Sequence, residues 1–170
     1  MNDAVAIDIA LFAFRVALGA VMLAHGINHI FGGGKIAGTA RWFESLGMRP
    51  GIVHAWTASI TEIGAGALLV TGLGTPLAAA GVVGVMLVAW ITNHRGKGFF
   101  IFRPGEGWEY VMSLTAAGLA LGTVGPGRFS LDHAFGLDEH LVGLWGLVIV
   151  AAAGGGGALL LLVAAWRPKK

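Results

Sequence analysis

The sequence predicts an all-α fold, a single transmembrane bundle of five helices formed by residues 1–170. Two features of the composition predict it: 56% of the residues are hydrophobic and only 12% are charged, whereas a soluble domain is about a quarter charged. The third observation is that apolar residues are concentrated in five segments, close to or above the roughly 20 residues that cross a bilayer core. The predicted spans are residues 4–31, 52–72, 76–92, 108–124 and 141–166.

The first span carries ionisable side chains within its apolar run, among them Asp8, Arg15 and His29. Such groups are costly in lipid unless they face protein, water or a partner. On a helical wheel these residues share one face with Gly19 and Gly26, and small residues allow a second helix to approach closely. We therefore predict that this face is turned towards the rest of the bundle.

The connector after the first span, residues 32–51, is polar and rich in glycine. In its centre the apolar Trp42 and Phe43 are interleaved with the charged Arg41 and Glu44. This pattern predicts a short amphipathic helix that lies at the membrane surface.

Glu62 is the one charged residue in the middle of the second span. Glu62 and Arg15 each lie about ten residues in from the outer end of their predicted span, which is roughly 15 Å at 1.5 Å per residue. Opposite charges at matching depth predict a buried ion pair between the two side chains. A second interpretation makes Glu62 a proton carrier or a ligand contact, because intramembrane acids often line such paths.

The later spans carry two glycine and proline signals. Pro76 opens the third span only three residues after the second span ends, and proline suits the first turn of a helix, so these two spans are expected to form a tight hairpin. The fifth span contains a run of glycines at residues 154–157. We expect this run either to kink the helix or to admit a neighbouring helix, since glycine is tolerated in membrane spans.

Basic residues are distributed unevenly between the two ends of the predicted bundle. Nine lie on the side of the first and third connectors and the C-terminus, whereas Arg128 alone lies on the other side. The positive-inside rule therefore places the N-terminus outside and the C-terminus in the cytoplasm. The basic side suits anionic lipid headgroups, so the net charge of +2 does not indicate nucleic-acid binding. The nine residues are Lys35, Arg41, Arg49, Arg95, Lys97, Arg103, Arg167, Lys169 and Lys170.

Polar side chains from four predicted spans gather near the cytoplasmic boundary. A pocket there would suit a polar headgroup, a quinone ring or a metal ion. His25 and His29 have the spacing of two metal ligands on one helix, but no H-E-x-x-H pattern accompanies them, and we expect no metal site. Contact of these histidines with lipid phosphate or with backbone is the alternative to ligand binding. The candidate ligand-binding residues are His25, Asn28, His29, His54, His94 and Glu109.

Other candidate residues have structural interpretations. Glu109 falls in the first turn of the fourth span, where a carboxylate complements the helix dipole. Arg128 and Asp132, four residues apart, are expected to clip the outer connector. The chain has no cysteine, which excludes thiol catalysis, thiolate metal sites and disulfides.

Five short motifs follow one another along the first four spans. They are R-V-A-L-G-A-V-M-L-A-H-G at residues 15–26, W-F-E-S-L-G-M at 42–48, E-I-G-A-G-A-L-L-V-T-G-L at 62–73, E-Y at 109–110 and G-R-F-S-L-D at 127–132. This order of motifs resembles the DoxX family of small bacterial integral membrane proteins. Two departures are that the family commonly has a lysine near the position of His29, and that the fifth segment exceeds the usual four-helix unit.

The resemblance implies a multi-pass protein of the bacterial plasma (inner) membrane that is associated with redox chemistry. Some relatives are subunits of thiosulfate:quinone oxidoreductase, and others associate with thiol-oxidant defence proteins. The expected function is therefore a membrane subunit that binds and positions a quinone or a partner, at most as part of an oxidoreductase complex. The expected partners are membrane lipids and either further protein subunits or a second copy of the chain.

Two other classes of function stay open. A non-catalytic scaffold or assembly subunit is indicated by the lack of cysteine, of a flavin or other cofactor motif, and of a nucleophile–base pair. A small transporter is indicated by the intramembrane charges, although the sequence shows no broken-helix repeats of the kind that transporters use.

Overall fold

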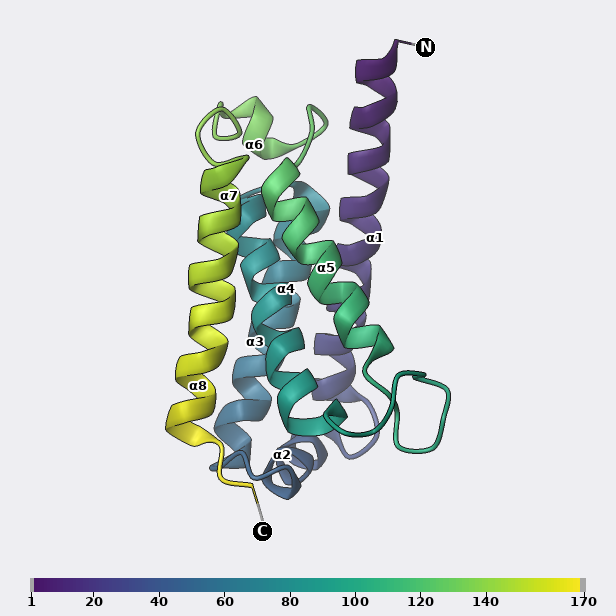
Figure 1. Ribbon diagram of the computed structural model, residues 1–170, viewed down its shortest axis with the longest axis vertical. Helices are drawn as coiled ribbons and strands as arrows, with labels where there is room; N and C mark the ends of the chain where they lie inside the picture. The colour runs from purple at the N-terminus through teal and green to yellow at the C-terminus, as the bar shows by residue number, and fades with distance from the viewer. Residues whose placement is uncertain (1, 169–170) are drawn as a thin grey trace.

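The computed structural model describes residues 2–168, and within them the chain is all-helical, with no β-strand. Figure 1 shows a bundle whose two chain ends lie at opposite ends of the long axis. The helices are α1 (Asp3–Phe31), α2 (Lys35–Ser45), α3 (Gly51–Thr71), α4 (Thr75–Ala89), η1 (Trp90–His94), α5 (Glu109–Val124), α6 (Leu131–Ala134), α7 (Leu144–Ile149), η2 (Val150–Gly156) and α8 (Gly157–Ala165).

Four helical stretches in the described residues are long and apolar enough to cross a membrane. They are α1, α3, the continuous α4–η1 and the continuous α7–η2–α8. The fourth predicted span coincides with α5, whose 16 residues extend only about 24 Å. The chain is therefore a multi-pass membrane protein in which one helix of the bundle is shorter than the bilayer core.

The predicted inner face of α1 is buried, most of it against α3 and its first turns against the outer connector. Asp8, Arg15, Gly19 and Gly26 are all buried, which confirms the orientation predicted for this helix. A Cβ atom added to Gly19 would lie 2.8 Å from the carbonyl oxygen of Gly66 on α3. The two backbones therefore touch, as small residues allow in membrane helices.

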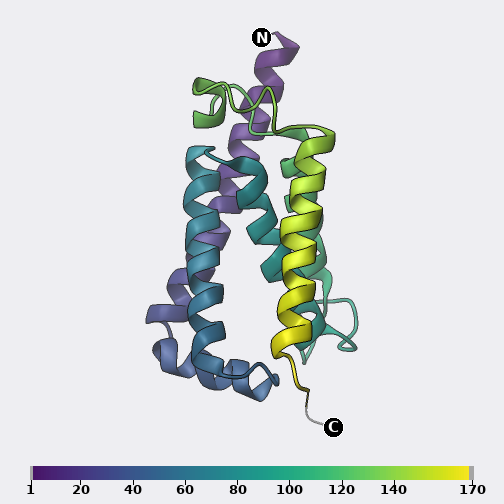
Figure 2. The ribbon, with the colours of Figure 1, turned by 90° about the vertical axis from the view of Figure 1, so that its left-hand side faces the viewer.

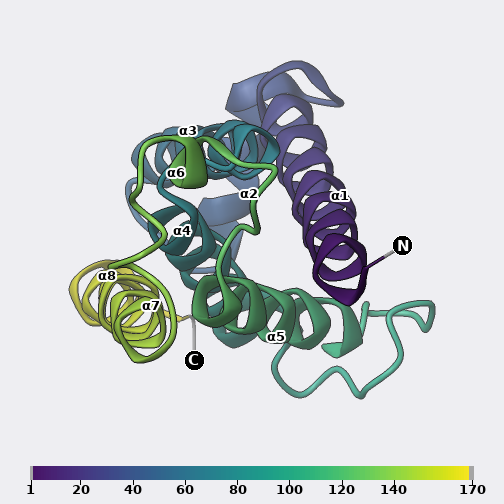
Figure 3. The same ribbon diagram turned by 90° about the horizontal axis from the view of Figure 1, so that it is seen from above.

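α4 is the central helix of the bundle. Figure 3, which looks down the bundle, shows α4 enclosed by α3, α5 and the α7–α8 stretch, with α1 beside α3 and α5. Gly154 of the glycine run packs on α4, where an added Cβ would lie 2.7 Å from the carbonyl oxygen of Ala80. The run thus admits a neighbouring helix, and the helix continues through it as a π-helical turn, η2.

α2 lies at the end of the bundle where the C-terminus is found, whereas α6 and the N-terminus lie at the opposite end (Figure 1). Phe43 and Ala40 of α2 are buried, while Arg41 and Trp42 are exposed. The helix is amphipathic, as its sequence predicts. It closes the end of the bundle towards which the candidate ligand-binding residues face.

Candidate ligand-binding cavity

Arg15 does not pair with Glu62, so the predicted buried ion pair is wrong. The Arg15 guanidinium instead donates to three backbone carbonyl oxygens: Leu69 at 2.5 Å, Val70 at 2.7 Å and Phe129 at 2.6 Å. Leu69 and Val70 belong to the last turn of α3, whose carbonyl groups have no partner within the helix. Arg15 thus caps the carboxyl end of α3 with a positive charge, which the helix dipole favours.

The register between α1 and α3 explains why the prediction failed. Gly19 lies level with Gly66, and Gly26 lies level with Ser59, so Glu62 is level with Leu23. That position is about eight residues, or roughly 12 Å, along α1 from Arg15. The first turns of α1 project beyond the other helices (Figure 1), so counting depth from the start of the apolar segment gave Arg15 the wrong level.

Glu62 meets His29 of α1 instead. The Nδ1 atom of His29 and the Oε2 atom of Glu62 lie 3.0 Å apart, although the pair is not aligned for a hydrogen bond. Glu62 is only 2% exposed. The contact is attractive when the imidazole carries a proton, and it joins the middle of α3 to the last turn of α1.

Arg128 and Asp132 each hold the outer connector, but through separate partners. The backbone N–H and the Nε of Arg128 donate to the two carboxylate oxygens of Asp8, at 3.0 and 2.6 Å. Asp132 accepts from the backbone N–H groups of Gly74 and Thr75 at 2.6 and 2.8 Å. The connector is thereby joined to α1 by one residue and to the amino end of α4 by the other.

A cavity of about 680 Å³ lies within the bundle and extends along α4 from Leu77 to η1, and its volume is within the range of 300–1,000 Å³ that is usual for small-molecule sites. It contains four of the six candidate ligand-binding residues. Asn28 and Glu109 do not line it: Asn28 is exposed, and the Glu109 carboxylate accepts from the backbone N–H of Ile101 at 3.3 Å. The ionisable and phenolic side chains that line it are His25, His29, His54, Glu62, His94, Glu106 and Tyr110.

Tyr110 is a cavity residue that belongs to the E-Y motif at residues 109–110 but was not among the ligand-binding residues predicted from the sequence. Its hydroxyl lies 2.9 Å from the Nε2 atom of His25, so α5 and α1 meet through a hydrogen bond. Glu109, its neighbour in sequence, was selected instead for its charge. One residue turns the side chain by about 100° on a helix, and that turn is what brings Tyr110 into the cavity.

His54 is the polar side chain of the cavity with the least satisfied hydrogen-bonding capacity. It is 6% exposed, and neither of its ring nitrogens has a hydrogen-bond partner among residues 2–168. His94, by contrast, bonds through Nδ1 to the backbone oxygen of Glu106 at 2.8 Å. An unpaired buried polar group costs about 1–3 kcal/mol, so a ligand or water molecule that bonded to His54 would be favoured.

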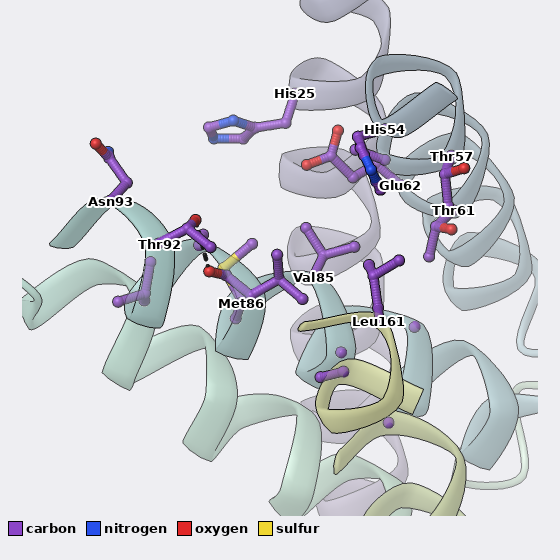
Figure 4. Close-up of a pocket in the computed structure, with 18 of the residues that line it drawn as sticks. His25, His54, Thr57, Thr61, Glu62, Val85, Met86, Thr92, Asn93 and Leu161 are labelled. Atoms are coloured by element: carbon purple, nitrogen blue, oxygen red, sulfur yellow. Dashed lines mark hydrogen bonds between the residues drawn. The ribbon is translucent and has the colours of Figure 1, made fainter. Parts of the chain in front are cut away.

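Ionisable side chains gather in one part of the cavity, whereas apolar side chains together with Thr57 and Thr61 line the part towards α8 (Figure 4). Figure 4 shows Glu62 and His54 of α3 gathered near His25, with Leu161 of α8 facing them from across the cavity. The arrangement combines a few convergent polar groups with an extended apolar wall, as sites for amphiphilic ligands do. Among the described residues no group of three or more His, Cys, Asp or Glu side chains could hold a metal ion.

Comparison with known proteins identifies the family. The DoxX family model matches residues 10–95, which is just over half of the chain. The chain belongs to the DoxX family. No curated protein and no solved structure matches the sequence. The matched DoxX segment runs from α1 to the end of η1 and contains the four cavity histidines, whereas Tyr110 and the α8 wall lie outside it.

Proposed function

We propose that this DoxX protein binds a quinone in the cavity and positions it for a redox partner in the bacterial plasma membrane. The observation that carries the proposal is His54, a buried imidazole at the polar part of a cavity of about 680 Å³, whose two ring nitrogens have no partner in the described part of the chain. A neutral imidazole has one N–H donor and one acceptor. A quinone carbonyl oxygen accepts from such a donor, and the apolar wall suits the rest of the ligand.

The fit extends to the neighbouring polar groups. Tyr110 and His25 bond to each other, and the Tyr110 hydroxyl has further hydrogen-bonding capacity for a second ring oxygen. Glu62 and His29 add two buried atoms without aligned partners, Oε2 and Nδ1. These residues would hold the quinone ring, orient it and exclude water from it.

The chain's own role is binding rather than electron transfer. A quinone supplies two-electron redox chemistry when it is bound, and hard chemistry of this kind belongs to the cofactor rather than to side chains. The chain has no cysteine, and its histidine, tyrosine and carboxylate side chains bind and orient. We therefore assign electron supply to a partner subunit.

We also propose that the cavity end of the bundle faces the cytoplasm. The C-terminus and α2 lie at that end (Figure 1). Nine of the eleven Lys and Arg residues are assigned to the same side by their place in the sequence, which the positive-inside rule associates with the cytoplasm. A redox partner would then reach the bound ring from the cytoplasmic side.

Titration of the purified protein with decylubiquinone tests quinone binding. Trp42 lines the cavity, so bound quinone should quench tryptophan fluorescence in a saturable way. His54→Leu should weaken binding about tenfold or more, because one lost hydrogen bond in a dry site costs more than 1 kcal/mol. Asn28→Ala is the matched control on α1, since Asn28 lies outside the cavity. Absence of saturable quenching in the wild-type protein would favour the scaffold function instead.

A further inference from the structure

The cavity continues from its polar part into a groove between α3 and α8. Figure 2 shows these two helices standing apart, with α4 between and behind them. The residues that line the cavity show that it extends between these two helices. The groove residues are Thr57, Ala58 and Thr61 of α3, Leu77, Gly81, Gly84 and Val88 of α4, and, across from α3, Ala153 of η2 with Gly157 and Leu161 of α8.

Small side chains create the groove. Ala153, Gly157 and Leu161 are spaced four residues apart, so they share one face of the fifth helix, and that face lines the cavity. A Cβ atom added to Gly157 would meet no atom within 4 Å. The helix therefore presents an open wall at this point.

His54 joins the groove to the polar part of the cavity. His54, Ala58 and Thr61 follow one another at helical spacing on α3 and all line the cavity, so the imidazole is the first member of the groove wall. Along α4 the groove runs from Leu77 to Val88, which is about 16 Å of helix. A ligand with its ring at His54 would place an attached chain along this wall.

The groove is open along its side. Thr57, Ala153 and Gly157 are exposed, and Leu77 is 62% exposed, although all four line the cavity. These residues lie within the spanning stretches of the bundle. An apolar chain could therefore enter from the bilayer without crossing the headgroup region.

The walls of the groove suit a single flexible hydrocarbon chain. Most of the side chains that line it are small or apolar, and it opens sideways within the spanning stretches of the bundle. One chain that enters from the bilayer would lie along these walls.

We propose that the groove between α3 and α8 takes the long apolar tail of the ligand from the side, so that the site selects long-tailed quinones over tail-free ones. This inference rests on the proposed function, because it assigns the tail of a ligand whose ring lies at His54. It also gives a role to the fifth helix, which lies beyond the matched DoxX segment: α8 forms the outer wall of the tail groove.

The test compares two probes and two matched variants. The probes are decylubiquinone and the same benzoquinone ring without the decyl chain, and both are titrated by tryptophan quenching. Gly157→Phe places a ring on the groove wall. Gly156→Phe is the control, because Gly156 is also free of neighbours within 4 Å but does not line the cavity. Phenylalanine is a better helix former than glycine, and equal melting temperatures would show that both variants fold.

The groove predicts that the wild-type protein binds the decyl probe more tightly than the tail-free probe. Gly157→Phe should weaken binding of the decyl probe about tenfold or more, as steric change in an apolar pocket does. It should leave the affinity for the tail-free probe unchanged. Equal binding of both probes, unaffected by Gly157→Phe, would overturn the groove and leave quinone binding intact. An equal loss of affinity for both probes in Gly157→Phe would also contradict the proposed tail groove. Failure of the wild-type protein to bind either probe would overturn the proposed function itself.

Discussion

Arg15 of α1 donates through Nη1 to the carbonyl oxygen of Leu69 at the carboxyl end of α3, at a distance of 2.5 Å. The guanidinium is fully buried, and its other bonds go to Val70 and Phe129. Gly72 follows in the left-handed conformation, at φ 69°, and a Cβ there would lie 2.7 Å from Arg15 Nη1. One arginine thus joins α1, the end of α3 and the outer connector.

Removal of Arg15 should destabilise the protein strongly. We expect Arg15→Leu to lower the free energy of unfolding by at least about 3 kcal/mol, because three carbonyl groups lose a charged donor worth about 1.5–3 kcal/mol each. Thermal unfolding in mild detergent measures the loss. Arg15→Leu combined with Glu62→Gln should show additive losses, since the two residues lie in separate networks. A coupling energy well above 0.5 kcal/mol would restore the ion pair that the structure contradicts.

A double-mutant cycle of His29 and Glu62 should show coupling, in contrast to the additive losses expected for Arg15 and Glu62. Because the two side chains touch at 3.0 Å, His29→Leu and Glu62→Gln should be coupled by about 1 kcal/mol or more. The double-mutant cycle is measured beside the Arg15 cycle, which serves as its control. Simple additivity of the His29 and Glu62 losses would show that the contact contributes nothing to stability.

Asp132 should matter more to stability than Arg128, although both hold the outer connector. Asp132 is 2% exposed and accepts from two backbone N–H groups at the start of α4, so Asp132→Ala should cost about 1–2 kcal/mol, as loss of a helix cap does. The Arg128 side chain is 52% exposed, and the screening of exposed ion pairs limits what Arg128→Leu can cost. Melting temperatures of the two variants decide the order, and an equal or larger loss for Arg128→Leu would contradict it.

Reporter fusions test the proposed orientation in the membrane. A reporter that works only in the cytoplasm should be active when it is joined after Lys170, because nine basic residues are assigned to that side. A second reporter inserted after α6, near the exposed Gly136, should report the outside, because α6 lies at the opposite end of the bundle (Figure 1). Periplasmic activity of the C-terminal fusion would reverse the topology.

Composition and helical periodicity were sufficient to predict several features. The all-α membrane class follows from the apolar content, because backbone groups in lipid must bond within helices. The buried face of α1 follows from the spacing of Asp8, Arg15, Gly19 and Gly26, since a charged side chain in a span has to face protein. The same periodicity predicted the amphipathic α2. These features depend on the local order of residues along one helix.

The partners of the charged residues were decided by the tertiary structure alone. Arg15 caps α3 and Glu62 meets His29 because α1 begins well outside the rest of the bundle and Gly19 sets the register against Gly66. Neither the offset of α1 nor its register against α3 can be derived from the sequence of one helix alone. The rotation of α5 that brings Tyr110 rather than Glu109 into the cavity depends on how whole helices pack. The separation of α3 from α8 depends on it as well. A sequence specifies which face of a helix is buried, whereas only the packed bundle fixes what that face meets.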